Sequence, residues 1–352
     1  MRIRTALVTL LAIALFGWFI SRANLSAVAA EIAHARLDLI VWAVLIAVVM
    51  PVVRAIRWRY LLDPIGPTRF GPVLRATILG FAALALLPAR AGDVLRPYLV
   101  ARAEGLNAAS VFATIVMERA LDLVAVLTLL AAFVWVFDGR AILPPRLLGP
   151  IEASAAMAAG TVVVLMAVMW TLATHPERIG RLVMRSDRLL PHRVAHRLAR
   201  LARTFSEGFA VAREPRALAI AFVWSFPLWA SIAFQVWLVT RAFEILIPVS
   251  ASFLLQAMLV IGVAVPTPGG VGSFHEAYRI AVTTFFGAPN NAAVSAALVL
   301  HAVSFLTSLV PGVVIMTHDG LSVAGLGQLA GVARQEERAG TDEMPVLRSS
   351  GR

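Results

Sequence analysis

The stretch VPTPGGVGSFHEAYR, residues 265–279, interrupts a long apolar segment with two prolines and three glycines. A histidine, a glutamate and an arginine follow this break within the same stretch. Inside a bilayer, backbone that is neither helix nor closed barrel leaves N–H and C=O groups unpaired, at a cost of several kcal/mol each. Such a break is tolerated only where protein or a water-filled cavity surrounds it. The stretch therefore predicts a place at membrane depth where a polar group is bound.

The composition is that of a membrane protein. The 352 residues are 60% hydrophobic and 14% charged, and the mean hydropathy is +0.83, which is too apolar for a soluble domain of this length. The absence of cysteine excludes disulfides, thiolate metal sites and cysteine nucleophiles. The net charge of +11 comes from arginine without any lysine, and such arginines cluster in cytoplasmic loops, where they contact anionic lipid headgroups. No aromatic–basic module can be read, so we expect no nucleic-acid partner.

Apolar runs long enough to cross a bilayer predict the fold class. We expect an all-α polytopic integral membrane protein with about six full spans and two re-entrant or broken helical hairpins. The first run also fits a cleavable signal peptide, because a basic start and an Ala-Val-Ala-Ala stretch flank it. We favour an uncleaved first span, since several spans follow it. The predicted spans are residues 5–20, 38–53, 110–137, 151–173, 217–240 and 292–317.

The distribution of arginine predicts the topology. Residues 174–216 hold ten arginines against four acidic residues, so the positive-inside rule assigns this segment to the cytoplasm. The same rule assigns the N-terminus and the five arginines between Arg54 and Arg75 to that side. These assignments agree only if residues 73–87 and the segment after them form a hairpin that returns to the cytoplasm. A second hairpin at 250–286 then leaves the C-terminus inside as well, for a protein of the cell's inner (cytoplasmic) membrane.

The two predicted breaks resemble each other. The first pairs a proline–glycine interruption with Asp93 and Arg96, three residues apart, and the second has Glu276 and Arg279 at the same spacing. Matching interruptions in two halves, entered from opposite faces, are typical of inverted repeats with a substrate site near the midplane. Chance is the alternative, because breaks of this kind are common in membrane helices and the acid-x-x-Arg pattern is weak.

We expect one membrane domain over residues 1–320 and a polar, disordered cytoplasmic tail over 321–352. The tail is far too short for a catalytic domain. Within the membrane domain, 174–216 predicts amphipathic helices in a cytoplasmic loop, because its arginines recur at spacings of three and four opposite apolar side chains. A surface helix on anionic lipid is the favoured interpretation, and a specific headgroup receptor is the alternative.

Three charged residues lie inside the apolar run 110–137. Glu118 and Asp122 are four residues apart and share a helix face, and Arg119 lies beside them. A charge near the bilayer centre costs about 2.5–3.5 kcal/mol on insertion scales, so such residues face the protein interior or water. A structural ion pair that locks helices together is one interpretation. We favour a polar site that these charges share with both breaks.

This shared site is predicted to be a headgroup-binding cavity. Its arginines suit phosphate because a guanidinium donates two parallel hydrogen bonds, helix N-termini after the glycines add N–H donors, and the carboxylates orient the arginines or engage a cationic group. We interpret Gln235 as part of a kinked helix, His301 and Ser304 as packing contacts, and His275 as a headgroup contact or a cap. No catalytic residue, metal ligand or cofactor is expected, because no G-x-S-x-G, P-loop or metal-ligand spacing occurs. The predicted site residues are Arg90, Asp93, Arg96, Glu118, Arg119, Asp122, Gly269, Gly270, Gly272, His275 and Glu276.

Four motifs occur in an order that resembles a known family. They are Arg54-x-x-Arg57-Trp58-x-x-Leu61-Leu62, Leu87-Pro88-x-Arg90-x-Gly92-Asp93-x-x-Arg96, Glu118-Arg119-x-x-Asp122 and Pro266-x-Pro268-Gly269-Gly270-Val271-Gly272-x-x-x-Glu276. Over about residues 5–320 the chain looks like the flippase-like transmembrane domain that forms the membrane half of lysylphosphatidylglycerol synthases. It departs from the family pattern at Asp93, where glutamate is expected, and at His275, which precedes Glu276.

The resemblance implies a role in moving lipid. In bifunctional members this domain transfers aminoacylated phosphatidylglycerol between leaflets after a soluble domain has made it. We expect no synthase domain here and do not transfer the synthesis reaction. The leading hypothesis is a lipid translocase without enzyme activity, whose partners are membrane lipids with anionic phospholipid headgroups. The alternatives are a non-transporting partner of a lipid-modifying or glycosyltransferase enzyme and, least favoured, a membrane-embedded lipid enzyme.

Overall fold

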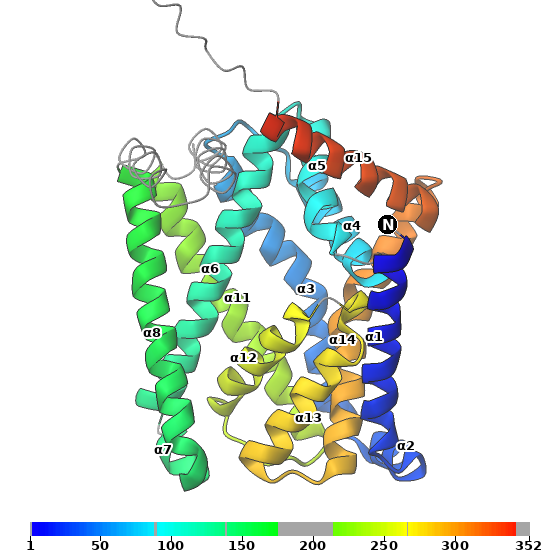
Figure 1. The fold of residues 1–352 in the computed structure, drawn as a ribbon, viewed down its shortest axis with the longest axis vertical. Helices are drawn as coiled ribbons and strands as arrows, with labels where there is room; N and C mark the ends of the chain where they lie inside the picture. The colour runs from blue at the N-terminus through cyan, green and yellow to red at the C-terminus, as the bar shows by residue number, and fades with distance from the viewer. Residues whose placement is uncertain (1, 88–89, 138, 175–213, 266, 343–352) are drawn as a thin grey trace, which may run out of the picture.

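The computed structural model describes residues 2–87, 90–137, 139–174, 214–265 and 267–342, and these residues form helices and no strand (Figure 1). The all-α prediction is confirmed. The amphipathic helices predicted for 174–216 fall almost wholly on residues outside this described part. The elements are α1 (Arg2–Ser21), α2 (Leu25–His34), α3 (Leu37–Leu62), α4 (Phe70–Leu86), α5 (Ala91–Glu104), α6 (Ala108–Trp135), α7 (Gly139–Ile142), α8 (Pro145–Thr174), α11 (Pro215–Ala242), α12 (Ala251–Ala264), the 3-10 turn η3 (Pro268–Gly270), α13 (Ser273–Phe286), α14 (Asn290–His318) and α15 (Val323–Asp342).

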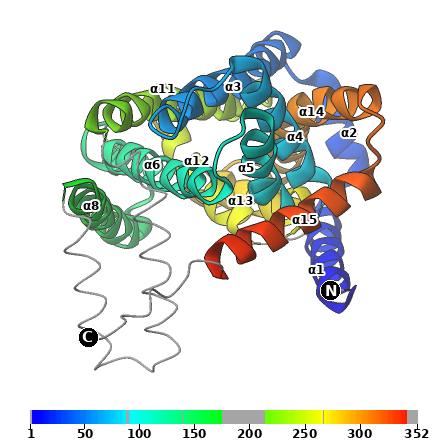
Figure 2. The ribbon, with the colours of Figure 1, turned by 90° about the horizontal axis from the view of Figure 1, so that it is seen from above.

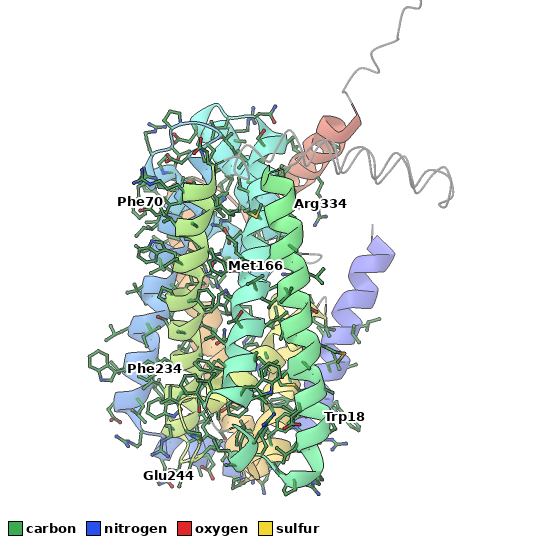
Figure 3. All side chains as sticks on the ribbon, turned by 90° about the vertical axis from the view of Figure 1, so that its left-hand side faces the viewer. Trp18, Phe70, Met166, Phe234, Glu244 and Arg334 are labelled. Atoms are coloured by element: carbon green, nitrogen blue, oxygen red, sulfur yellow. The ribbon has the colours of Figure 1, made fainter. Side chains whose placement is uncertain are left out.

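Five of the six predicted spans lie within a helix of 20 to 30 residues, and the sixth, 110–137, extends two residues beyond the end of α6 at Trp135. Four of these helices, α3, α8, α11 and α14, are long and apolar enough to cross a membrane, and α1 and α2 form a pair bent by 81°. α6 has 28 residues and carries three charges in its middle. On the outside of the bundle, apolar side chains such as Trp18, Met166 and Phe234, labelled in Figure 3, are exposed. The chain is a multi-pass membrane protein whose outer surface suits lipid.

Two helical hairpins, α4–α5 and α12–α13, enter the bundle from opposite ends, and their tips meet near its middle (Figure 1). In the first hairpin the helices are so close that a Cβ on Gly92 would lie 1.9 Å from the carbonyl oxygen of Gly80. Between the tips, a Cβ on Gly269 would lie 3.3 Å from the carbonyl oxygen of Ala85. Small residues permit such approach between membrane helices. The two predicted broken hairpins are confirmed, in the placement that the inverted-repeat interpretation requires.

The sequence between the first hairpin and α6 explains how the chain turns back into the bundle. α5 ends at Gly105, whose φ of 67° is a left-handed conformation that glycine adopts without strain. Asn107 then accepts a hydrogen bond from the backbone N–H of Ser110 at 3.1 Å and caps α6. These two signals fix the start of the helix that carries the intramembrane charges.

The start of α1, the end of α8, the start of α11 and the whole of α15 lie toward one end of the bundle (Figure 1). This is the common side that the arginine distribution requires for the N-terminus, the arginine-rich segment and the C-terminal region. The order of full spans and half-length hairpins therefore agrees with the predicted topology.

The disordered tail predicted for 321–352 is wrong over most of its length, because α15 is a helix that lies across the end of the bundle (Figure 2). Leu326, Ala330 and Ala333 recur at spacings of four and three and are all buried. Leu326 and Ala333 pack in one cluster with Leu95 and Tyr98 of the first hairpin. The many polar residues of this segment hid a short apolar stripe that is sufficient to hold a helix on the bundle. Residues 343–352 lie outside the described part.

Candidate functional site

The first carboxylate of α6 is held between arginines of two other helices. Glu118 is fully buried, and its Oε1 accepts a hydrogen bond from Arg96 Nη1 at 2.9 Å and lies 3.4 Å from Arg57 Nη2. The Arg96 guanidinium lies over the Trp58 ring, 3.9 Å from its centroid, which is a favourable cation–π contact. The ion pairs therefore join α3, α5 and α6.

Asp122, one turn further along α6, extends this cluster to α11. Its Oδ1 accepts hydrogen bonds from Arg57 Nη1 at 2.6 Å and from the Trp229 indole at 2.8 Å. Its Oδ2 lies 4.0 Å from Arg54 Nη1. Arg57 also donates to the Ser225 hydroxyl at 2.9 Å. Hydrogen bonds that involve ionised groups are roughly twice as strong as neutral ones, so Asp122 fixes the orientation of the arginines around it.

Arg119 links the cluster to the tip of the first hairpin. Its Nη2 donates to Asp93 Oδ1 at 2.7 Å, and its Nη1 lies 3.7 Å from Asp122 Oδ2. Arg90, which precedes α5 with a left-handed φ of 53°, donates from Nε to Asp93 Oδ2 at 3.0 Å. Asp93 is thus shared by two arginines, and the tip is tied to α6.

The ion-pair network carries a net positive charge. Among the described residues it joins five arginines to three carboxylates, so two positive charges lack a carboxylate. Several buried N–H groups, including Arg54 Nη1 and both Nε and Nη2 of Arg96, also have no hydrogen-bond partner. Burying charged donors without partners costs free energy, and a bound anion would offset that cost. The eight residues of the network are Arg54, Arg57, Arg90, Asp93, Arg96, Glu118, Arg119 and Asp122.

A cavity of about 470 Å³ lies beside this network, between both hairpin tips and the helices α3, α6, α11 and α14. Four charged residues reach its wall: Arg54, Arg90, Arg119 and Asp122. The rest of the wall is mostly apolar, and the volume of the cavity is in the range of small-molecule sites. Its uncharged polar side chains are Gln235, Gln256, Thr267, Ser304 and Ser308.

The glycine-rich break forms the tip of the second hairpin. Gly269 and Gly270 line the cavity with φ values of 59° and 69°, which favour glycine. His301 Nε2 donates to the carbonyl oxygen of Gly269 at 2.8 Å, and His275 Nδ1 accepts from the backbone N–H of Gly272 at 3.2 Å. The two imidazole rings lie 4.4 Å apart. Both histidines therefore hold the tip loop in place.

The structure brings only part of the predicted site to the cavity. Arg90, Arg119, Asp122, Gly269 and Gly270 form part of its wall. The other three charged residues predicted in the first half of the chain belong to the ion-pair network behind that wall; they are Asp93, Arg96 and Glu118.

The remaining three predicted residues lie away from the cavity wall. Glu276 is paired with Arg279 of its own helix, at 2.5 and 2.8 Å, and is not part of the cavity wall, so its role in the shared site stays a prediction. The acid-x-x-Arg spacing forms a local pair one helical turn long, which needs no other partner. His275 packs against Phe19 of α1, and Gly272 approaches the backbone of the same helix.

Arg54 and Arg57 were not predicted as site residues. The span predicted to end at residue 53 left both in a cytoplasmic loop, but α3 continues to Leu62. Two arginines three residues apart, followed by Trp58, would have marked a polar helix face within the membrane. Ser304, predicted as a packing contact, in fact lines the cavity.

A family model described as the lysylphosphatidylglycerol synthase TM region matches residues 5–312. The chain belongs to this family. The resemblance inferred from the four motifs is confirmed, and the whole ion-pair network falls within the matched range. Among curated proteins, none matches the chain.

Membership of the lysylphosphatidylglycerol synthase TM-region family gives the chain a role related to membrane lipids. In this TM region, the carboxylates of the network are each engaged by arginine, and no group of three or more His, Asp or Glu side chains within the described residues could hold a metal ion. What the wall offers to a ligand is cationic N–H donors, backbone at two glycines and neutral hydrogen-bonding groups. Groups of this kind are suited to an anion, which they would hold through charge-assisted hydrogen bonds.

Proposed function

We propose that the chain is a lipid translocase, which moves a phosphate-bearing lipid between leaflets while the headgroup occupies the cavity and the acyl chains stay in the bilayer. The observation that carries this proposal is the network with two uncompensated positive charges at the wall of a mid-bundle cavity. The family's connection with membrane lipids supports it.

The energetics favour an anionic group in this cavity. Each uncompensated charge at membrane depth costs about 2.5–3.5 kcal/mol on insertion scales. A phosphate offsets this cost because each guanidinium donates two parallel hydrogen bonds to it. Arg54 is the arginine best suited to this role, since it reaches the wall, has an unpartnered Nη1 and is 4.0 Å from its nearest carboxylate.

We also propose that the end of the bundle with α15 faces the cytoplasm of the inner membrane. The support comes from the ten arginines of 174–216, which follow the end of α8 at that end of the bundle. A protease or labelling reagent applied to right-side-out and inverted vesicles tests this orientation. Modification of the α15 end in right-side-out vesicles would contradict it.

A transport assay tests the translocase proposal. Purified full-length protein is reconstituted into vesicles that contain an acyl-labelled fluorescent phosphatidylglycerol, and dithionite measures how fast the label reaches the outer leaflet. We expect wild type to exceed protein-free vesicles, and Arg54→Gln to be slower by roughly tenfold or more, because a hydrogen bond to a charged group contributes about 1.5–3 kcal/mol.

Arg36→Gln is the matched control for this experiment. Arg36 pairs with Asp38 on the exposed surface, so its loss removes the same charge far from the cavity. We expect this variant to transport at the wild-type rate. A wild type no faster than protein-free vesicles would refute the translocase and favour a non-transporting partner of a lipid-modifying enzyme. An Arg54→Gln rate equal to wild type would refute the role of the cavity.

A further inference from the structure

The cavity wall contains a buried amide without a partner. Gln256 on α12 is 2% exposed and lines the cavity, and within the described part of the chain neither its Nε2 nor its Oε1 has a hydrogen-bond partner. A buried polar group left unpaired costs about 1–3 kcal/mol. Apart from Ser252 in the first turn, the rest of α12 is apolar or glycine, and within the described part of the chain the amide of Gln256 adds no hydrogen bond to the fold. The amide therefore needs a reason other than folding.

The neighbouring polar side chains offer neutral hydrogen-bonding groups. Gln235 on α11 donates to the Ser304 hydroxyl at 3.1 Å, and both side chains line the cavity. Ser308 lies one turn beyond Ser304 on α14 and lines it too. Gln256 differs from Gln235 because its donor and acceptor are both unused. This part of the wall carries amides and hydroxyls rather than charges.

The amide part of the wall is displaced along the bundle from the arginines. Gln256 is the sixth residue of α12 and so lies about 8 Å from the start of that helix, at the base of the second hairpin. Arg119 lies about 17 Å into α6, which begins at the opposite end of the bundle. A ligand that fills the cavity therefore meets cationic donors at one part and neutral donors and acceptors at another.

We infer that Gln256 forms an uncharged subsite for hydroxyl groups of the headgroup whose phosphate binds the arginines. This inference rests on the proposed function. A carboxamide both donates and accepts, as a hydroxyl does, whereas an ammonium group can only donate. Among the described residues of the wall, Asp122 is the carboxylate, and its Oδ1 accepts from Arg57 and Trp229. Its Oδ2 accepts no hydrogen bond but lies 3.7 Å from Arg119 and 4.0 Å from Arg54, and these two cations disfavour a third one beside it. The ligand class that fits is an anionic phosphodiester lipid with uncharged hydroxyls, such as a glycerol or sugar headgroup, rather than a lipid with a cationic headgroup.

Two lipids of equal charge test the subsite. Phosphatidylglycerol has two headgroup hydroxyls, and phosphatidylethanol has the same phosphodiester without any. With acyl-labelled forms of both in the vesicle assay, we expect wild type to move phosphatidylglycerol about tenfold faster, the ratio that one or two neutral hydrogen bonds provide. Gln256→Met keeps the length of the side chain and removes the amide. This variant should move phosphatidylglycerol at the phosphatidylethanol rate and leave the phosphatidylethanol rate unchanged.

Leu259→Met is the matched control, because Leu259 lines the cavity one turn from Gln256 and the exchange nearly conserves volume. It should keep the wild-type ratio. Thermal unfolding separates structure from binding: Gln256→Met removes an unpaired amide and should be at least as stable as wild type. A Gln256→Met protein that unfolds earlier or fails to fold would show a structural partner for the amide, and would overturn the inference.

The outcomes for this subsite differ from those for the translocase itself. Wild type that moves both lipids equally, or Gln256→Met that keeps the wild-type ratio, overturns the subsite while the translocase stands. Wild type that moves neither lipid overturns both. A binding measurement with soluble glycerol phosphate completes the test. If glycerol phosphate binds the purified protein through Gln256 while neither labelled lipid moves, the ligand is the free phosphate and the lipid subsite is refuted.

Discussion

The close approach between Gly92 and Gly80, the tightest that a Cβ on any described glycine would meet, allows a quantitative test of the first hairpin. In Gly92→Ala the new Cβ would lie 1.9 Å from the carbonyl oxygen of Gly80, whereas real contacts of this kind are not shorter than 3.0 Å. α5 must therefore move away from α4 by about 1.1 Å. The new atom would also lie 2.9 Å from the backbone nitrogen of Leu84. Both neighbours are backbone atoms, so a side-chain rotation cannot make room for it. Overpacking costs typically 1–3 kcal/mol, and a clash with backbone places the cost near the upper value, at about 3 kcal/mol.

The displacement should also reach the ion-pair network. Arg96 lies one turn beyond Gly92 on α5 and donates to Glu118 at 2.9 Å. A shift of about 1 Å stretches this hydrogen bond past 3.5 Å, where it no longer contributes. We therefore expect Gly92→Ala to lower both the free energy of unfolding in a denaturant titration and the rate of lipid movement.

Gly71→Ala is the control on the same hairpin, because a Cβ at Gly71 meets nothing within 4 Å. Alanine in a helix is more stable than glycine by about 0.5–1 kcal/mol, so this variant should gain stability. Opposite signs for the two glycine variants are the expected result. If Gly92→Ala unfolds at the same denaturant concentration as wild type, the contact between α4 and α5 does not exist as described.

Three further predictions concern other contacts. Asp122→Asn leaves Arg57 buried with one carboxylate fewer and should lower the free energy of unfolding by about 3 kcal/mol, whereas Asp38→Asn at the exposed pair should change nothing measurable in the same titration. The hydrogen bond from Arg75 lowers the pKa of Asp319, so the stability that this pair contributes is present at neutral pH and is lost as pH falls through the lowered pKa. In Asp319→Asn, the melting temperature should therefore fall less between neutral and acid pH than it does in wild type. His301→Phe removes the bond to the second hairpin tip and should raise hydrogen exchange at 267–274, and unchanged protection would contradict that role.

The hairpins were predictable because two independent patterns indicated them. Proline and glycine marked the interruptions, and the arginine counts required that each interruption return the chain to its own side. Neither pattern indicates how far apart the two hairpins lie in the folded chain. That the tips touch at Ala85 and Gly269, and that a cavity lies beside them, depends on how full-length helices pack around both hairpins.

The partners of the charges were less predictable than the charges themselves. Glu118 and Asp122 stood out because an apolar helix has few reasons to contain them. Arg54 and Arg57 did not, because an arginine just after an apolar run ordinarily marks the end of a span. Arg57 meets Asp122 across 65 residues of sequence, so only the tertiary structure shows that α3 continues within the bundle. Glu276 is the converse case, since its arginine partner lies three residues away on the same helix.

The half-length hairpins also decide which contact keeps the membrane sealed against ions. α12 and α13 have 14 residues each, about 21 Å, against about 30 Å of hydrocarbon. In this sector of the bundle, neither hairpin alone insulates one aqueous phase from the other, and the insulation is completed where Ala85 meets Gly269. A charge that crosses the whole membrane gains or loses about 2.3 kcal/mol per 100 mV, so an opening between the two tips would let ions leak under the membrane potential.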